Sequence, residues 1–238
     1  MMKKTGFLLL LTIAAWPAFA QQSFGWGINL FPNISNRRLI AYSNITTDMI
    51  RDIEKRETSK PSYAAHLFAS WRGEKVGFQV GAGFANAGYR TVEEAIPTDD
   101  PDFANALTRR FVFRNYNIEI PASLKFYQSL SDKDYFNFML GTNLSYNLGN
   151  DTLTVLYNDG TSSTRSVSDE SDFRKLNYAF TTGLGWEHRF SPKFTLILQP
   201  TFTFWIKALF KETEFTELNR NLYNFGVSVG FRFDRELE

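Results

Sequence analysis

Residues 136–148 read Phe-Asn-Phe-Met-Leu-Gly-Thr-Asn-Leu-Ser-Tyr-Asn-Leu, and this alternation of apolar and polar residues decides the fold. Large apolar side chains occupy every second position except Thr142, and the positions between them carry small or polar residues together with Met139. A period of two is typical of a β-strand with one apolar face, because successive side chains point to opposite sides of the sheet. The stretch therefore predicts a strand whose two faces meet different surroundings.

Seven other segments show the same alternation, which predicts an all-β chain. They are residues 24–31, 62–71, 76–89, 116–127, 176–190, 194–206 and 223–233. Residues 72–75, 129–134 and 191–193 form tight polar turns between them, whereas residues 33–61, 91–112, 150–173 and 211–220 form long connections. Short turns on one rim and long loops on the other are typical of bacterial outer-membrane barrels. We therefore predict an eight-stranded antiparallel transmembrane up-and-down β-barrel with short periplasmic turns and long extracellular loops.

The first residues carry the pattern of a secretory signal peptide. Two lysines near the start are followed by an apolar stretch at residues 7–15 and by Ala-Phe-Ala at residues 18–20. A membrane anchor is the alternative, but the apolar stretch is shorter than the roughly 18 residues that a spanning helix needs. We therefore predict a cleaved signal peptide at residues 1–20, Sec-dependent export to the outer membrane, and a barrel domain at residues 21–238.

The composition excludes several classes of site and partner. The chain has no Cys, so it contains neither a disulfide framework nor a thiolate metal site or nucleophile. Because Lys3 and Lys4 leave with the signal peptide, 24 of the 26 basic residues remain against 25 acidic residues, a net charge of −1. That balance gives no reason to expect a nucleic-acid partner.

The composition of the second strand face indicates which side of the sheet meets lipid. Period two alone leaves two alternatives, a lipocalin-type cup with its apolar face inside and a membrane barrel with its apolar face outside. The second face is mostly Gly, Ala, Ser and Asn, which suits the crowded lumen of a small barrel better than bulk water. We therefore predict that the apolar face meets outer-membrane lipid, with aromatic girdles at both interfaces. The candidate girdle residues, for which ordinary packing is the alternative, are Tyr63, Trp71, Tyr89, Tyr116, Tyr146, Tyr178, Trp186 and Tyr223.

Charged residues on the inner face predict a polar network in the lumen. An isolated ion in a low-dielectric interior is costly, so these side chains must pair. The predicted network consists of His66, Glu119, Lys125, Glu187, Arg189, Lys207 and Arg232. Side chains just fill the interior of an eight-stranded barrel. We therefore expect the network to plug the barrel and leave no open diffusion pore.

The order of signal peptide, alternating segments and long outer loops resembles the small eight-stranded barrels of the OmpA-like type. Residues 116–127, Tyr-Asn-Ile-Glu-Ile-Pro-Ala-Ser-Leu-Lys-Phe-Tyr, more specifically resemble the E-I-P-x-x-L-K-Y strand of the PorT-like outer-membrane barrel family common in Bacteroidota. The namesake of that family is associated with a secretion machine, so the resemblance implies an envelope role that is secretion-related. The resemblance also implies that the barrel-assembly machinery reads a terminal aromatic residue. Here that residue is Phe233, which is followed by a polar tail.

Two features of the connections and strands are expected to be irregular. Pro121 cannot donate a hydrogen bond to the ladder, so we predict a local irregularity there. Residues 47–57 predict a short amphipathic helix with an Asp52–Arg56 pair, and Asp100 with Pro101 predicts a second helix running to Leu107. Asn-Asp-Gly at residues 158–160 predicts a hairpin turn that joins residues 152–157 to residues 161–167 above the membrane.

The sequence assigns no catalytic, cofactor-binding or metal-ligating residues. His66, with Ser62 or Ser70, suggests a Ser/His hydrolase of the small lipid-A-modifying type, but no third catalytic member or nucleophile motif accompanies it. We expect His66 to be a hydrogen-bonded residue of the lumen network. We predict a structural or interaction barrel that binds a protein, a glycan or another envelope component through its outer loops or periplasmic turns. A lipid-modifying enzyme and a small-ligand carrier are the alternatives.

Overall fold

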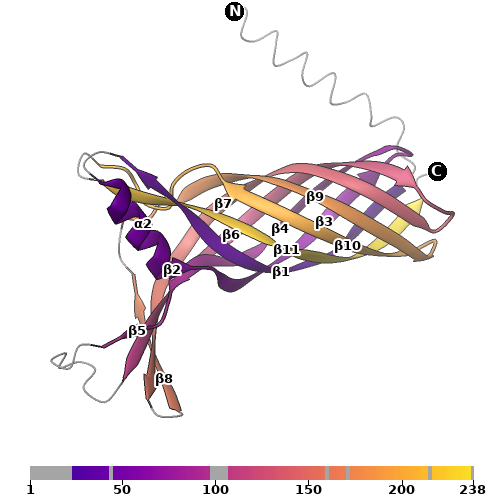
Figure 1. Ribbon diagram of the computed structural model, residues 1–238. Coiled ribbons are helices and arrows are strands. Elements are labelled where there is room, and N and C mark those ends of the chain that lie inside the picture. Colours follow the sequence, from indigo (N-terminus) through magenta and orange to yellow (C-terminus); the bar gives the residue numbers. More distant parts are fainter. Residues whose placement is uncertain are drawn as a thin grey trace, which may run out of the picture.

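The computed structural model describes residues 23–42, 45–96, 107–158, 161–169, 172–213 and 216–236. The predicted signal peptide at residues 1–20, the predicted helix start at Asp100 and residues 159–160 of the predicted hairpin turn lie outside the described residues. Eight long strands form a barrel (Figure 1). They are β1 (Ser23–Ala41), β3 (Lys60–Arg72), β4 (Val76–Thr91), β6 (Thr108–Ser129), β7 (Asp134–Asn158), β9 (Leu176–Ser191), β10 (Phe194–Trp205) and β11 (Leu218–Glu236). The connections carry helix α2 (Thr47–Arg56) and the shorter strands β2 (Glu57–Thr58), β5 (Glu94–Ala95) and β8 (Thr161–Ser168).

The long strands pair in a closed ring. Each pairs antiparallel with the next long strand along the chain, and β1 pairs with β11 from Ser23↔Glu236 to Ala41↔Leu218. The predicted all-β fold, an eight-stranded antiparallel up-and-down barrel, is therefore confirmed. No helix among the described residues is long and apolar enough to cross a membrane.

The connections differ at the two ends of the barrel, as predicted. Residues 73–75, 130–133 and 192–193 are tight turns at the end where β1 begins and β11 finishes, which we call the short-turn end (Figure 1). All longer connections lie at the opposite end, the long-loop end.

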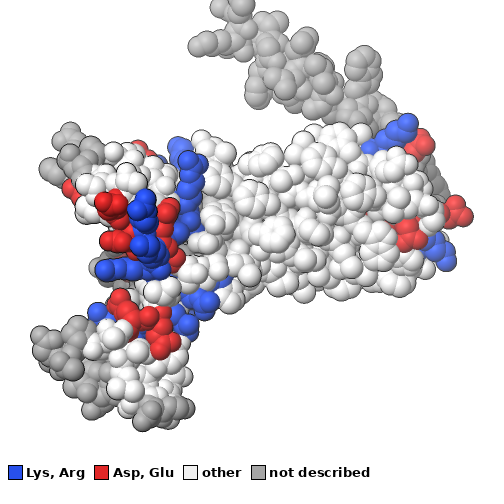
Figure 2. Space-filling model, in the orientation of Figure 1, with Lys and Arg blue, Asp and Glu red and all other residues white. Residues whose placement is uncertain are grey.

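The barrel is polar inside and apolar outside. Outward side chains such as Leu67 and Phe225 are 63% and 60% exposed, whereas the inward side chains of Asn137 and Glu187 are fully buried. On the face shown in Figure 2, charged residues gather at the two ends and leave a broad uncharged band between them. This distribution is the reverse of a lipocalin-type cup, and it places the apolar face where lipid would lie.

Several strands are longer than the alternation predicted. The predicted connections at residues 33–61, 91–112 and 150–173 are in part continuations of β1, β6 and β7 at the long-loop end. The outer face loses its regular apolar pattern there although the ladder continues, so the sequence pattern ends before the strand does.

The continuations of β6 and β7 belong to a second sheet, which we call the side sheet. It consists of β5, residues 108–114 of β6, residues 151–158 of β7, and β8, in that order. It turns away from the barrel axis and extends sideways from the long-loop end (Figure 1). The pairing of β7 with β8 matches the predicted hairpin.

The turn away from the axis coincides with two backbone irregularities. The β6–β7 register shifts between Tyr116 and Asn117, and bulges of this kind bend a strand. On β4, Gly88 has a φ of +142°, and a Cβ atom there would lie 2.0 Å from the carbonyl oxygen of Phe113. Only glycine fits this close approach of β4 to β6.

Two local predictions have mixed outcomes. The β4–β6 ladder lacks pairs between Val80↔Ala122 and Gly83↔Glu119, beside Pro121, although its register is unchanged. The helix predicted at residues 47–57 is α2, and the side chain of Thr46 caps it by accepting from Met49 N. The predicted Asp52–Arg56 pair is wrong: Asp52 pairs instead with Lys55, three residues away, at 3.8 Å.

Candidate functional site

A cluster of charged residues fills the lumen at the short-turn end, and Glu187 lies at its centre. Arg232 Nη1 lies 2.8 Å from Glu187 Oε2, Arg72 Nη1 lies 3.6 Å from the same oxygen, and Lys125 Nζ lies 3.6 Å from Oε1. Asn137 Nδ2 donates to Oε1 at 3.3 Å. All five side chains are buried. Three cations thus surround one carboxylate in an interior of low dielectric, where each of these contacts is strong.

A second carboxylate and two tyrosines complete this cluster, which we call the plug. Asp234 Oδ1 accepts from Arg232 Nε at 2.7 Å, and Asp234 Oδ2 accepts from Thr195 Oγ1 at 2.7 Å. The guanidinium carbon of Arg72 lies 4.3 Å and 3.9 Å from the ring centroids of Tyr127 and Tyr135. Such cation–π contacts stabilise a guanidinium that is removed from water.

The structure brings the predicted network residues Lys125, Glu187 and Arg232 together in the plug. Arg189 is half-buried beside it, with its guanidinium carbon 5.6 Å from the Tyr135 ring centroid. Arg72 and Asp234 were missed by the sequence analysis. A signal for both was present, since each continues the inward alternation of its strand by one position beyond the predicted boundary.

Lys207 does not lie in the lumen, and its predicted place in the network is wrong. The strand β10 ends at Trp205, so alternation no longer sets the direction of the side chain two residues later. Lys207 is exposed on the outside, with Nζ 5.6 Å from the ring centroid of Tyr178.

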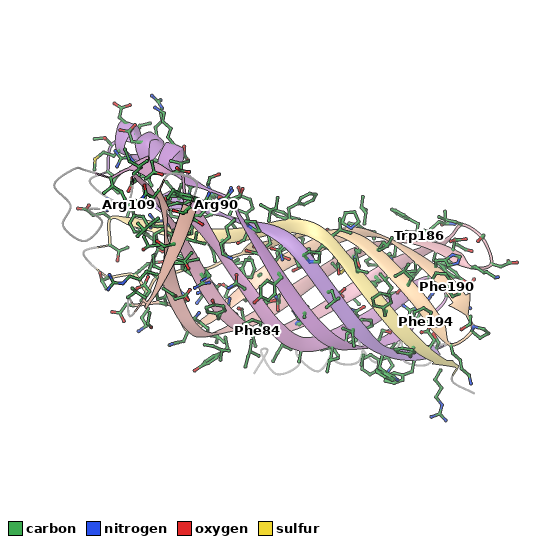
Figure 3. All side chains as sticks on the ribbon, turned by 90° about the horizontal axis from the view of Figure 1, so that it is seen from below. Phe84, Arg90, Arg109, Trp186, Phe190 and Phe194 are labelled. Atoms are coloured by element: carbon green, nitrogen blue, oxygen red, sulfur yellow. The ribbon has the colours of Figure 1, made fainter. Side chains whose placement is uncertain are left out.

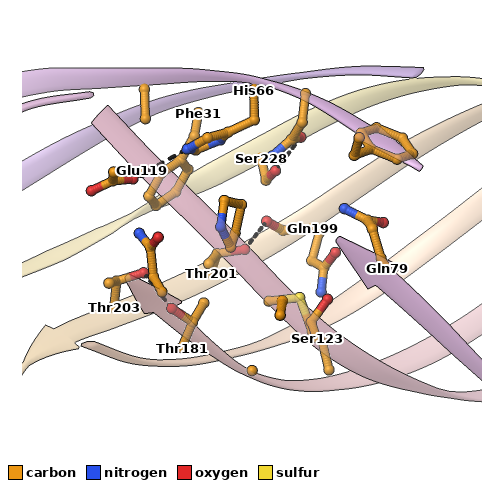
Figure 4. Close-up of a pocket in the computed structure, with 18 of the residues that line it drawn as sticks. Phe31, His66, Gln79, Glu119, Ser123, Thr181, Gln199, Thr201, Thr203 and Ser228 are labelled. Atoms are coloured by element: carbon orange, nitrogen blue, oxygen red, sulfur yellow. Dashed lines mark hydrogen bonds and ion pairs between the residues drawn. The ribbon is translucent and has the colours of Figure 1, made fainter. Parts of the chain in front are cut away.

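The middle of the lumen holds a cavity of about 80 Å³ that both polar and apolar side chains line (Figure 4). His66 and Glu119, two predicted network residues, meet on its wall with His66 Nε2 3.1 Å from Glu119 Oε2. Buried side-chain atoms around it, including Glu119 Oε1 and Gln199 Nε2, have no hydrogen-bond partner within the described part of the chain. A cavity of this size has room for several water molecules, which could bond to these polar atoms.

The two serines considered with His66 are engaged elsewhere. Ser62 Oγ accepts from Lys60 Nζ at 2.8 Å, and Ser70 Oγ donates to the carbonyl oxygen of Gly25 at 3.4 Å. His66 itself is bonded to Glu119, so the hydrogen bonds of these residues within the described part of the chain form no Ser–His pair.

An apolar cluster covers the lumen at the long-loop end, and we call it the lid. Its buried members are Ala87, Tyr89, Phe173, Ala179, Trp205, Leu209 and Leu222, with Phe113 and Phe210 packed against them. Phe173 and Phe210 also form a β-bridge that joins the connection before β9 to the connection after β10. The cavity therefore lies between the plug at one end of the lumen and the lid at the other.

Tyr89 is part of the lid, so its predicted place in the membrane-facing girdle is wrong. It is 3% exposed and stacks on Phe113 with ring centroids 4.7 Å apart. The β4–β6 register runs without a shift from Val76 to Tyr89. Because Tyr89 is an odd number of residues from the outward Phe84, its side chain must point inward.

The other predicted girdle residues lie on the outside of the barrel. Tyr63, Tyr116, Tyr146, Tyr178 and Tyr223 lie toward the long-loop end, whereas Trp71 and Trp186 lie toward the short-turn end. Figure 3 shows Trp186 near the short-turn end together with Phe190 and Phe194. Phe233, the predicted contact for the assembly machinery, faces outward at this end beside Trp26 and Phe194.

An ion-pair clamp fixes the first long connection to the barrel. Glu57, directly after α2, accepts from Arg37 Nε at 2.6 Å and from Arg220 Nη2 at 2.5 Å. These arginines come from β1 and β11, so the clamp joins the helix to both strands that close the ring. Glu57 and Arg220 both fell in predicted loops, where the sequence offered no alternation to pair them.

A half-buried hydrogen-bonded pair lies at a short turn. Asp134 Oδ1 is 2.8 Å from His188 Nδ1, and Asp134 Oδ2 accepts from Ser131 Oγ at 2.7 Å. These hydrogen bonds, with that of His188 the strongest, hold the pKa of the Asp134 carboxyl below its usual value. Within the described residues, no group of three or more His, Cys, Asp or Glu side chains could hold a metal ion.

Comparisons with known proteins show which family has this architecture. A family model described as an outer membrane protein beta-barrel domain matches residues 19–204. A search of curated proteins found no match.

Solved structures of outer-membrane barrels are similar over most of the chain. Neisserial surface protein A is 13% identical, with 88% of this chain and 96% of that chain covered and a TM-score of 0.42. OprG from Pseudomonas aeruginosa is 8% identical, with 92% and 98% covered and a TM-score of 0.42. The outer membrane protease OmpT from Escherichia coli is 8% identical, with 90% and 97% covered and a TM-score of 0.35.

The family match covers most of the chain and agrees with a closed ring of strands that is apolar outside and polar inside. The chain therefore belongs to the outer membrane protein beta-barrel domain family, and its location is the outer membrane.

Proposed function

We propose that this protein is a sealed, non-conducting barrel that acts as an interaction protein. Its outer structure would present a binding surface to a protein, a glycan or another envelope component. The observation that carries this proposal is that side chains pack the lumen at both of its ends, in the plug around Glu187 and in the lid around Trp205. Long loops of outer-membrane barrels lie outside the cell, so the side sheet and α2 are the ordered surfaces that such a partner would meet.

The finer assignment is to the PorT-like barrels of Bacteroidota, with a secretion-related role in an envelope assembly. Residues 116–127 support it, because they carry the Glu-Ile-Pro and Leu-Lys elements of the strand typical of that group. The clamp of Glu57 supports an interaction role more generally, since it holds α2 in a fixed position at the long-loop end. A preorganised surface loses less entropy when it binds.

We also propose that the protein is not an enzyme. The bond between His66 and Glu119 and the separate engagement of Ser62 and Ser70 support this reading. Mass spectrometry of lipid A from cells that express the wild type or His66→Gln tests it. A lipid A species that appears with the wild type and disappears with the variant would favour the hydrolase alternative.

Two measurements test the proposed function. The purified barrel in a planar bilayer should give no conductance steps, and steady conductance would contradict a sealed lumen.

A photo-crosslinking residue placed at Ser163 of β8 should capture a partner in intact envelopes, whereas the same residue at Asp132 in a short turn serves as the control. A partner captured only from Asp132 would move the binding surface to the periplasmic side and overturn this assignment.

A further inference from the structure

One face of the side sheet continues the lipid-facing wall of the barrel. Arg114 lies on the same side of β6 as the outward Tyr116, since the two residues are two positions apart along the strand. Arg90 of β4 pairs with Val112 of β6, and Arg110 pairs with Val155 of β7. Directly paired residues share a face. The resulting surface, which we call the membrane-side face, consists of Arg90, Arg110, Val112, Arg114, Leu153 and Val155.

The direction of the side sheet turns this face toward the membrane. The sheet leaves the barrel sideways, so the face that continues the outer wall looks back along the barrel toward its uncharged band (Figures 1 and 2). Tyr116 belongs to the tyrosine girdle of the long-loop end, and Arg114 lies about 7 Å farther along the strand, at a rise of about 3.3 Å per residue. That is the level at which lipid head groups lie above an aromatic girdle.

Two arginines of this face have no acidic partner in the described part of the chain. Arg114 is neutralised by Asp151, with Nε and Nη2 each 2.6 Å from a carboxylate oxygen. Arg90 and Arg110 have no such ion pair, and their Nε atoms are buried without a hydrogen-bond partner in the same part of the chain. Arg110 is held in place by the Tyr157 hydroxyl, to which it donates, and by the Tyr157 ring.

Arg90 and Arg110 are arranged to bind a phosphate group from outside the chain, because no carboxylate of the described part of the chain pairs with them. A guanidinium presents a planar set of donors that matches phosphate oxygens, and such contacts strengthen where water is partly excluded. The half-buried Val112 and Leu153 provide an apolar floor between the arginines, and the exposed Thr164 of β8, which pairs with Val155, lies beside it on the same face.

We propose that the membrane-side face binds phosphate groups of lipid in the outer leaflet, through Arg90 and Arg110. The side sheet then rests on the membrane surface, and its opposite face is turned outward. That opposite face carries Arg109, which is paired with Glu94, and the exposed Arg165. The proposal does not depend on which partner the outward face binds.

The test uses the absence of Cys from the chain, which makes Thr164→Cys a single labelling site. The full chain, labelled there with an environment-sensitive fluorophore, is refolded into phosphatidylcholine vesicles that contain increasing fractions of bisphosphorylated lipid A. A fluorescence change that saturates is expected, and dephosphorylated lipid A should not produce it. A response of equal size to both lipids would overturn the proposal without any substitution being needed.

Substitutions then locate the response. Each arginine near a membrane surface contributes about fivefold to the affinity for anionic lipid. In R90Q/R110Q, half-saturation should therefore require a fraction of lipid A about 25-fold higher. R165Q removes the same charge from the opposite face and should leave half-saturation unchanged.

Three further outcomes would overturn the proposal that the membrane-side face binds lipid phosphate. An unchanged response in R90Q/R110Q, or an equal loss in R165Q, would overturn the proposal. Inorganic phosphate added to vesicles of phosphatidylcholine alone should have no effect, and a full response to it would replace the lipid with a free ion and likewise overturn the proposal. If R90Q/R110Q fails to refold, R110K serves instead, because it keeps the charge but loses the planar fork, and its half-saturation should still rise.

Discussion

At the scale of single residues, Glu187 holds the plug together because it is the common partner of three cations. It faces Arg72, Lys125 and Arg232 at once, and all four are buried. Asp234 offsets part of the positive charge, but among these three cations, all within the described residues, only Arg232 forms an ion pair with it. The plug is therefore sensitive to the loss of one carboxylate in a way that an exposed ion pair is not.

Replacing Glu187 with Gln should lower the free energy of unfolding by about 3–5 kcal/mol, because the substitution leaves buried cations without their common partner. Urea titration of the protein refolded into vesicles measures the change. Asp132→Asn, in an exposed short turn, is the control and should shift the stability by less than about 0.5 kcal/mol. Equal effects of the two substitutions would show that the plug does not depend on Glu187.

The lipid-facing wall makes a separate prediction at Leu140. Its side chain points outward from the middle of the part of β7 that pairs with β9, so Leu140→Arg should cost about 2–4 kcal/mol in the same titration. Leu130→Arg, at the exposed tip of a short turn, should be nearly neutral. If both substitutions have the same small effect, the outward face does not contact lipid hydrocarbon.

The Asp134–His188 pair predicts that the stability of the folded protein depends on pH. The folded pKa of Asp134 lies below its usual 3.8, so the ionised carboxyl stabilises the folded state. This stabilisation is fully present above pH 3.8 and is lost as the pH falls through the lower folded value. The melting temperature of the wild type should therefore fall in this acidic range more steeply than that of Asp134→Asn. If the melting temperatures of the two proteins fall in parallel with pH, the ionised Asp134 does not stabilise the folded state.

At the scale of elements, the sequence predicts a strand where one face is apolar and fails where it is not. The lipid-facing part of β7 was predicted because residues 136–148 alternate with only two exceptions, Met139 and Thr142. Its continuation to Asn158 lies above the membrane and carries no such pattern. The same limit explains why the pairing of β5 with β6 was missed, since two-residue strands depend on neighbours that are distant in sequence.

The bend between barrel and side sheet depends on Gly88. Replacing it with Ala forces a side chain into a backbone conformation with φ of +142° and against the Phe113 carbonyl oxygen. We expect a loss of about 1–3 kcal/mol in stability. Gly149→Ala is the matched control, because a Cβ atom there meets nothing within 4 Å. If Gly88→Ala leaves the stability unchanged, β4 and β6 can move apart at this point without a loss of free energy.

At the scale of the whole molecule, the barrel and the side sheet should be separable. The β7–β9 ladder that belongs to the ring runs from Asp134 to Tyr146, before the side sheet begins. A variant with residues 152–167 replaced by a short turn should therefore still fold into the heat-resistant form that runs differently from the boiled chain in gel electrophoresis. Failure of this variant to fold would show that the side sheet is needed to form the ring.

The lumen could be predicted only where its residues continued a recognised strand. Glu119, Lys125, Glu187 and Arg232 alternate with clear outward apolar residues, so their inward direction followed from the sequence. The lid could not be predicted in this way, because Phe173 and Leu209 come from connections without periodicity. Lys207 shows the opposite error, in which alternation was extended past the true end of β10.

The pairing of β1 with β11 also determines the order of events in biogenesis. Ser23 pairs with Glu236, so the two segments that complete the ring are nearly the first and the last of the described chain to be synthesised. Until β11 emerges, β1 and β10 each expose a row of unpaired backbone groups, which cannot remain in hydrocarbon. Insertion must therefore wait for the complete chain or for another protein that covers these edges. A premature stop before β11 would remove the whole protein from the membrane rather than leave a smaller barrel.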